Sequence, residues 1–245
     1  MFPKKIASLL ILIASFAFIN PLSAQQPKAT APTAPGEAIA NLGPLLDRVN
    51  ALKSELREYH ACSDKFGCYA KDLDLEADRA IAFLRKRARH LQPGEKLAMV
   101  LDIDETTLSN WDEMSTANFE FDSKTFNAWV ESAEAPAIPG TLRVYDEAQR
   151  LGVSVFFLTG RSESQRASTE TNLRLRGFSK WQQLIMRNPD QGQMTALVYK
   201  SAERARIVAA GYRIILNIGD QWSDLGGNPQ AEYSVKYPDP FYFIK

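Results

Sequence analysis

The chain has 245 residues, of which 45% are apolar and 24% are charged, so it can bury an ordinary globular core in one large domain or two small ones. Lysine plus arginine and aspartate plus glutamate both number 29, and the formal net charge is zero. This balance offers no electrostatic basis for a nucleic-acid polymer or an anionic membrane as a partner.

The N-terminus has the layout of a secretory signal peptide, which we predict over residues 1–24. Two lysines precede a run of apolar and small residues over 6–19, which is short for a membrane span, and a plausible cleavage site follows at Ala24. This layout predicts an exported protein, periplasmic or secreted. Residues 22–24 would begin a bacterial lipoprotein signal if cysteine came next, but Gln25 is there instead, so we expect no stable membrane anchor after cleavage. The alternative is that the segment is retained as an N-terminal anchor.

Residues 25–41 are rich in proline, alanine and threonine, which is typical of a flexible linker. Apolar residues then recur at helical spacing over 42–59 and again over 73–91. These two stretches predict an N-terminal helical extension. The linker would end where this extension begins, so the predicted domain covers residues 42–245.

The two cysteines of the chain, Cys62 and Cys68, lie between the predicted helices. In an exported chain an even number of cysteines favours a disulfide, and closing so small a loop contributes about 2 kcal/mol by chain entropy. The alternative is a metal clip that also uses His60. One histidine and two cysteines would leave a tetrahedral site incomplete, so the disulfide is favoured.

From Lys96 onward, short apolar runs alternate with amphipathic helical stretches. This alternation predicts an α/β fold, with a doubly wound parallel sheet and right-handed crossovers. The segment 107–138 interrupts the pattern and is rich in Trp, Phe and acidic residues, which indicates a small helical cap insert. We expect strands at 97–103, 153–158, 183–186, 213–218 and 233–237, and helices at 141–151, 164–176 and 201–210.

Three of the predicted strands end in residues that can bind a ligand. These are Asp102 and Asp104, Thr159 and Gly160, and Asp220 and Asp224. Parallel strands end at one edge of the sheet, where such folds bind ligands, so these groups should converge. Converging carboxylates repel one another and need a cation, and oxygen ligands favour Mg²⁺. Each piece alone could be a turn or a helix cap, but their joint occurrence in this order favours a site.

The same residues resemble a known family. Asp102–Thr106, Thr159, Lys200 and Gly219–Asp224 are similar to the four ordered motifs of the haloacid dehalogenase (HAD) superfamily, whose sheet is Rossmann-like. The segments 199–201, 211–214, 217–225 and 237–242 narrow the resemblance to the acid phosphatase branch, which includes plant vegetative storage proteins and bacterial outer-membrane acid phosphatases. The resemblance covers roughly residues 56–245.

The resemblance implies a covalent mechanism on a small phosphomonoester. Asp102 would attack phosphorus and form an aspartyl-phosphate. Asp104 would protonate the leaving oxygen and then activate water. Thr159 and the Gly160 amide would hold phosphoryl oxygens, and Lys200 would neutralise charge shared by Asp102 and the phosphate.

The resemblance also implies a Mg²⁺ site. Its ligands would be the Asp102 carboxylate, the Asp104 backbone carbonyl and Asp220. Asp224 would act through a water or by orienting Lys200. The expected activity is that of an exported, magnesium-dependent acid phosphatase. The alternatives are a phosphotransferase that uses the same intermediate, and a non-enzymatic protein that binds ligands or stores amino acids on the same scaffold.

The insert should select the substrate, because aromatic residues crowd it between Trp111 and Trp129. Trp111 lies closest in sequence to Asp102, so we predict that it binds substrate by stacking on a nucleobase or an aryl leaving group. Nucleoside monophosphates and aryl phosphates are therefore the expected substrates. The alternative is that Trp111 belongs to the core, which is the usual place of an aromatic residue.

Overall fold

The computed structural model describes residues 42–62 and 67–244. Contacts divide the chain into two units, Met1–Leu45 and Leu46–Lys245, and the second contains the sheet. The predicted signal peptide over 1–24 and the predicted linker over 25–41 lie outside the described residues. Within the described ranges, no helix combines the length and the apolar character that a membrane crossing requires.

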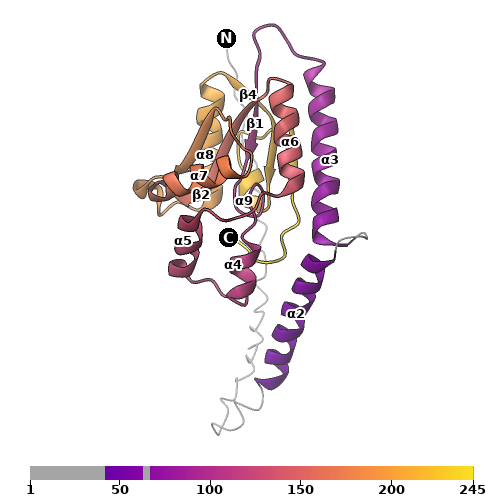
Figure 1. Cartoon of the computed structure of the whole chain (residues 1–245). Helices are drawn as coiled ribbons and strands as arrows, with labels where there is room; N and C mark the ends of the chain where they lie inside the picture. Colours follow the sequence, from indigo (N-terminus) through magenta and orange to yellow (C-terminus); the bar gives the residue numbers. More distant parts are fainter. Residues whose placement is uncertain (1–41, 63–66, 245) are drawn as a thin grey trace, which may run out of the picture. The chain divides into compact units, whose positions relative to one another are not determined.

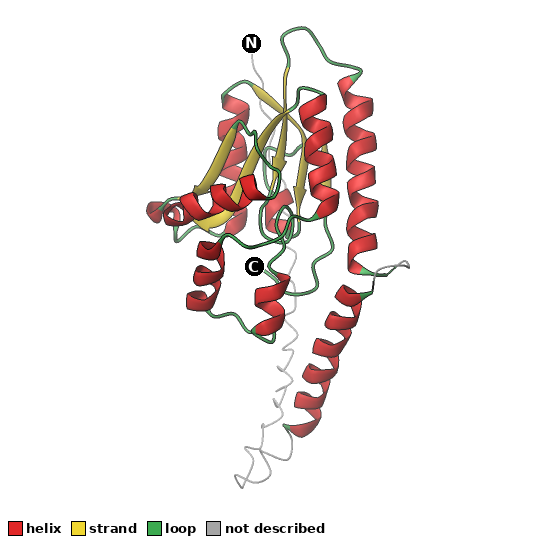
Figure 2. Cartoon of the chain, viewed as in Figure 1, coloured by secondary structure: helices red, strands yellow, loops and turns green. Residues whose placement is uncertain are grey.

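Five parallel strands form one sheet in the order β3-β2-β1-β4-β5 (Figures 1 and 2). The predicted α/β fold with a parallel, doubly wound sheet is confirmed. The central strand, β1, pairs with β2 on one side and β4 on the other. The strands are β1 Lys96–Leu101, β2 Ser154–Ser162, β3 Gln183–Arg187, β4 Tyr212–Gly219 and β5 Tyr233–Lys236.

Helices cover both faces of the sheet because its central strands are apolar on both sides. On β2, Phe157 packs into the core cluster that also holds Leu84, Val144 and Leu173, from three helices on one face. Its neighbour Phe156 points the other way and packs with residues of α8. The three helices are α3 Tyr69–Ala88, α6 Pro139–Arg150 and α7 Arg166–Leu175, and α8 is Ala196–Ala209.

One helix begins earlier than the sequence predicts. Thr195 caps α8, with its hydroxyl accepting a hydrogen bond from the Val198 amide at 3.4 Å. The sequence pattern predicts a start at residue 201, which would place Lys200 before the helix. In the structure Lys200 lies inside α8 on its buried side. From this position its ammonium group points at the ends of β1 and β4.

The segment between β1 and α6 contains two short helices, α4 Trp111–Thr116 and α5 Ser123–Ser132. Asp122 caps α5 by accepting hydrogen bonds from the Lys124 and Thr125 amides. A four-residue helix, α9 Trp222–Leu225, follows β4, and two 3-10 turns span Glu163–Gln165 and Pro189–Gln191.

The helical extension consists of α2 Gly43–Ala61 and α3, which continues into the domain. The predicted disulfide between Cys62 and Cys68 is present, with the two Cα atoms 5.2 Å apart. It joins the end of α2 to the residue that precedes α3. Gly140, at the start of α6, lets α6 approach α3 closely, because a Cβ there would lie 2.9 Å from the Ala77 Cβ.

Candidate active site

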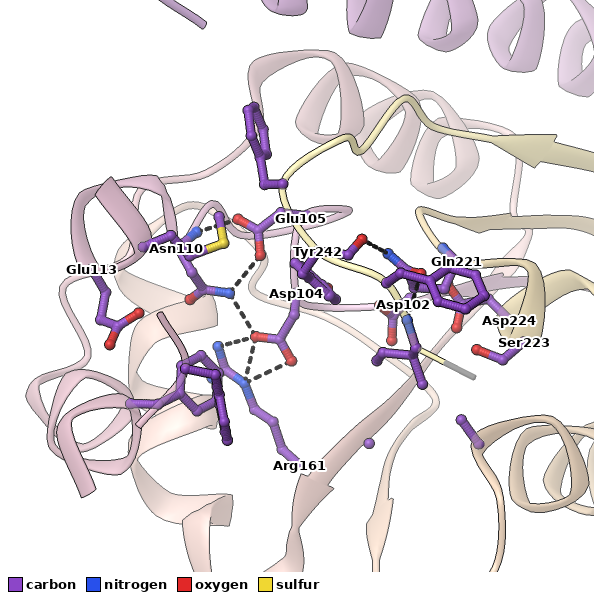
Figure 3. Close-up of a pocket in the computed structure, with 18 of the residues that line it drawn as sticks. Asp102, Asp104, Glu105, Asn110, Glu113, Arg161, Gln221, Ser223, Asp224 and Tyr242 are labelled. Carbon is purple, nitrogen blue, oxygen red and sulfur yellow. Dashed lines mark hydrogen bonds and ion pairs between the residues drawn. The ribbon is translucent and has the colours of Figure 1, made fainter. Parts of the chain in front are cut away.

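The carboxyl ends of β1, β2 and β4 meet at a cavity of about 680 Å³, as the sequence predicts for strands of a parallel sheet (Figure 3). Asp102 follows β1 directly, Gly160 lies near the end of β2, and Asp224 comes from α9 after β4. All three line the cavity together with Lys200 from α8. Residues more than 120 positions apart in the sequence therefore share one site.

Lys200 joins two carboxylates. Its Nζ lies 2.6 Å from Oδ1 of Asp102 and 2.5 Å from Oδ1 of Asp224, and all three side chains are buried. Such charge-assisted hydrogen bonds are among the strong ones in proteins. The second oxygen of Asp224 accepts a hydrogen bond from the Gln221 amide at 2.8 Å, so Asp224 is fixed on both sides.

Asp220 is held by three donors. Its Oδ1 accepts from the Thr106 hydroxyl at 3.0 Å. Its Oδ2 accepts from Gln221 Nε2 at 2.8 Å and from the Tyr242 hydroxyl at 3.0 Å. Neither Gln221 nor Tyr242 is among the site residues predicted from the sequence. The signal was present, because both belong to the segments that carry the family resemblance.

The carboxylates of Asp102, Asp220 and Asp224 carry more negative charge than the nearby Lys200 ammonium can neutralise. Burial raises the pKa of Asp102, the Lys200 ammonium opposes that rise, and Asp224 and Asp220 add to it. Burial and then Asp224 raise the pKa of Asp220 to about 8. Burial alone would lower the pKa of Lys200, but Asp102 and Asp224 outweigh it, so the pKa rises. One ammonium group cannot balance three buried carboxylates.

The chemistry of this donor set fits a divalent cation. One carboxylate oxygen from each of Asp102, Asp220 and Asp224 lies within 4.8 Å of the others. Oxygen-only ligands suit hard cations, and a divalent charge would offset the excess negative charge. The Asp104 carboxylate does not belong to this cluster. Its predicted ligand atom is the backbone carbonyl, and that assignment stays a prediction.

The Asp104 side chain contacts Arg161 and Asn110 instead (Figure 3). Burial would raise the pKa of Asp104, but the guanidinium charge and the hydrogen bonds from Arg161 and Asn110 outweigh burial and lower it. Neither partner is among the site residues predicted from the sequence. Arg161 could have been noticed, because it follows Thr159 and Gly160 directly, whereas nothing in the sequence singled out Asn110.

Thr159 and Gly160 occupy different positions. The Thr159 side chain is fully buried, and its hydroxyl accepts a hydrogen bond from the Arg161 amide at 3.1 Å. It is not among the residues that line the cavity, whereas Gly160 is. Their predicted contact with phosphoryl oxygens remains a prediction for both.

Trp111 does not line the cavity. Its half-buried ring stacks on His60 of α2, with the ring centroids 3.6 Å apart and the planes 2° from parallel. The predicted role of Trp111 in substrate binding therefore gains no support from the cavity lining. The aromatic residues that do line it are Phe119, Phe121, Phe126, Phe241, Tyr242 and Phe243.

The family model described as HAD superfamily, subfamily IIIB (Acid phosphatase) matches residues 46–245. Acid phosphatase 1 of Solanum lycopersicum is 40% identical over 190 residues, which cover 76% of this chain and 68% of that protein. The Stem 31 kDa glycoprotein of Glycine max is 41% identical over 60% of this chain and 59% of its own length. Vegetative storage protein 1 of Arabidopsis thaliana is 33% identical over 59% of this chain and 54% of its own length.

The fold is also similar to a solved structure. The class C acid phosphatase from Bacillus anthracis superimposes with a TM-score of 0.66 at 21% identity, over 80% of this chain and 86% of that one. At this level of identity the likeness concerns the fold.

Proposed function

The chain belongs to subfamily IIIB of the HAD superfamily, the acid phosphatases, and from this premise we propose that it hydrolyses small phosphomonoesters through an aspartyl-phosphate at Asp102. The observation that supports this best is the position of Asp102. Its carboxylate follows the central strand, faces the cavity and is paired with Lys200 inside a cluster of carboxylates. Such a group is placed to attack a phosphorus atom held in the cavity.

The proposed reaction has two steps. First, a carboxylate oxygen of Asp102 bonds to phosphorus while the bond to the leaving oxygen breaks, and that oxygen takes a proton from Asp104. Second, water gives a proton to Asp104 and attacks phosphorus, and the bond between phosphorus and Asp102 breaks. Inorganic phosphate leaves, and both aspartates return to their starting states.

Charge is the main obstacle to the first step. At about 4 Å and an effective dielectric constant of about 20, one pair of unit like charges costs about 4 kcal/mol. That is about three decades in rate if it is not offset. Lys200 offsets part of the cost, because its ammonium group is fixed 2.6 Å from Asp102 by the fold and needs no rearrangement during the reaction.

We propose that the divalent cation suited to the carboxylate cluster is Mg²⁺, held by the Asp102 and Asp220 carboxylates and the Asp104 backbone carbonyl. When bound, it would supply positive charge to the phosphoryl oxygens. The contacts of Asp224 with Lys200 and the Gln221 amide favour the second of its two predicted roles, the orientation of Lys200.

The proposed substrates are nucleoside monophosphates and aryl phosphates. The cavity presents several phenylalanines, including Phe119 and Phe126 from the segment between β1 and α6. Stacking on one ring contributes roughly 1–3 kcal/mol. If the contact is equal in the ground and transition states, it lowers KM and leaves kcat unchanged.

We further propose that the protein is exported. The Cys62–Cys68 disulfide supports this, because disulfides persist in oxidising compartments.

The deciding experiment is phosphate release by the purified exported protein over a panel of nucleoside, aryl and sugar phosphates. Each substrate is measured with Mg²⁺ and with excess chelator, and an alcohol is added in a parallel series to detect phosphoryl transfer. We expect hydrolysis that chelator abolishes and Mg²⁺ restores. No release from any substrate would favour the storage or binding alternative, and a phosphorylated alcohol as the main product would favour the phosphotransferase.

A further inference from the structure

Asn110 lies at the end of the segment that joins β1 to α4, and its side chain is fully buried. Its Nδ2 donates one hydrogen bond to Oδ1 of Asp104 and another to Oε2 of Glu105, both at 2.9 Å. Its backbone amide donates to Oε1 of Glu105 at 2.5 Å. Both hydrogens of the amide group are therefore used on carboxylates.

The indole of Trp129 on α5 determines which way this amide faces. Trp129 Nε1 donates to Oδ1 of Asn110 at 2.9 Å. If the amide were reversed, its oxygen would face Asp104 and Glu105, and its NH₂ group would face the indole N–H. Both sides of the reversed amide would then oppose groups of the same kind. The orientation seen is the one in which every polar atom of the side chain is paired.

Arg161 holds the same carboxylate from the end of β2. Its Nη2 and Nε lie 2.7 and 3.0 Å from Oδ1 of Asp104, and its Nη1 is anchored on the Thr169 hydroxyl at 3.2 Å. Together with Asn110, this gives three donors to Oδ1. Among the described residues, Oδ2 has a single donor, the Arg161 Nε at 3.3 Å. The two oxygens of Asp104 are therefore not equivalent.

We propose that Asn110, oriented by Trp129, is a positioning residue that acts with Arg161 to immobilise Oδ1 of Asp104 and leave Oδ2 as the oxygen that transfers the proton. This inference rests on the proposed function. In the first step the bond between phosphorus and the leaving oxygen breaks, and the proton on Oδ2 passes to that oxygen. Through Trp129, α5 is coupled to this step although it supplies no reacting atom.

The consequence depends on the leaving group. A 4-nitrophenolate departs readily without a proton, whereas the more basic phenolate depends more strongly on protonation as it leaves. Misplacing Asp104 should therefore slow cleavage of phenyl phosphate more than cleavage of 4-nitrophenyl phosphate. The two substrates have the same ring system, so loss of ring contacts would affect both. kcat/KM is the quantity to compare, because it includes departure of the leaving group and excludes hydrolysis of the intermediate.

The test uses Asn110→Ala and Trp129→Phe in the full chain. Trp129→Phe keeps an aromatic ring on α5 and removes the N–H donor together with part of the indole, so it remains informative if Asn110→Ala folds poorly. The matched controls are Asn172→Ala, which removes a buried amide bonded to the Ala135 carbonyl, and Trp181→Phe, whose ring packs on Phe157.

We expect the ratio of kcat/KM for phenyl phosphate to that for 4-nitrophenyl phosphate to fall about tenfold in Asn110→Ala and about threefold in Trp129→Phe. The ratio should stay at the wild-type value in both controls. An unchanged ratio in the two test variants, with any loss equal for both substrates, would overturn the inference and leave the proposed function standing. A wild-type protein that cleaves neither substrate would contradict the proposed function and, with it, the inference about Asn110.

Discussion

At the scale of single residues, the decisive feature is that Lys200 serves two aspartates at once. Its ammonium group lies between Asp102 and Asp224, and all three groups are buried. Removing the charge of one aspartate leaves the other in place, so Lys200 does not become an unpaired buried charge, which is the usual reason that such substitutions unfold a protein. Function and stability can therefore be separated here.

Asp102→Asn is expected to reduce phosphate release by at least about a thousandfold while the melting temperature stays within a few degrees of wild type, because the amide keeps the shape but is a poor nucleophile. The rate is measured with 4-nitrophenyl phosphate and the melting temperature by circular dichroism. Asp122→Asn is the matched control, since asparagine also caps a helix well. Turnover near wild type in Asp102→Asn would rule out the aspartyl-phosphate.

At the scale of elements, the aromatic contacts of α4 hold it against its neighbours. The Trp111 ring stacks on His60 of α2 and meets Phe241 of the C-terminal segment edge to face, with centroids 5.0 Å apart. These contacts give Trp111 a structural explanation that needs no substrate. They also connect the segment between β1 and α6 to the helical extension.

Trp111→Ala should therefore lower the free energy of unfolding by roughly 2–3 kcal/mol and change kcat/KM for nucleoside and sugar phosphates alike. His60→Ala should be similarly destabilising, and the double variant should lose less than the sum of the two single losses. Chemical denaturation and steady-state kinetics on the same preparations measure both effects. A rise in KM confined to nucleotides would instead restore the substrate-binding role.

The packing of α3 on α6 contains an ion-paired carboxylate that makes stability depend on pH. Glu147 of α6 accepts hydrogen bonds from Arg150 and from Arg85 of α3, and these bonds lower its pKa from 4.5 to about 2. Because the folded-state pKa is the lower one, the contribution is fully present above pH 4.5. It is lost as the pH falls towards 2.

Glu147→Gln should accordingly melt at a lower temperature than wild type at pH 6, and the difference should shrink between pH 4.5 and pH 2. The effect should be small, because both arginines are more than half exposed and water screens the pairs. Melting curves across this pH range measure it. A difference that stays constant with pH would mean that packing, and not the charge of Glu147, is responsible.

At the scale of the whole molecule, the disulfide ties the end of α2 to the start of α3. It closes a short loop, and restricting the unfolded chain in this way contributes about 2 kcal/mol. The site lies in other elements, at the ends of β1 and β4. Loss of the disulfide should therefore lower stability without changing activity.

The variant with both Cys62→Ser and Cys68→Ala should lose about 2 kcal/mol of stability and keep wild-type kcat at 25 °C. Alanine is used at position 68 because that side chain is fully buried. Protein isolated from an oxidising compartment should show no titratable thiol after denaturation without reductant. Two free thiols under these conditions would mean that the bridge is absent from the natural protein.

The sequence by itself determined the fold class and which acidic residues converge at one edge of the sheet. Buried parallel strands are continuous apolar runs, and the polar residues that end them must lie at one edge of the sheet. For this reason Asp102, Asp220 and Asp224 could be brought together from their places in the chain. The cysteine pair could be matched for a similar reason, because there were only two cysteines and they lay close together.

The tertiary structure alone decided which side chains surround these groups. Asn110, Arg161 and Tyr242 approach the aspartates from different segments, and their contacts depend on distances that no local pattern encodes. The direction of the Trp111 ring was also decided by the tertiary structure, because nearness in sequence to Asp102 does not show which way a ring points. A stacking partner 51 positions earlier, His60, lies beside it only because α2 and α4 meet in the folded chain.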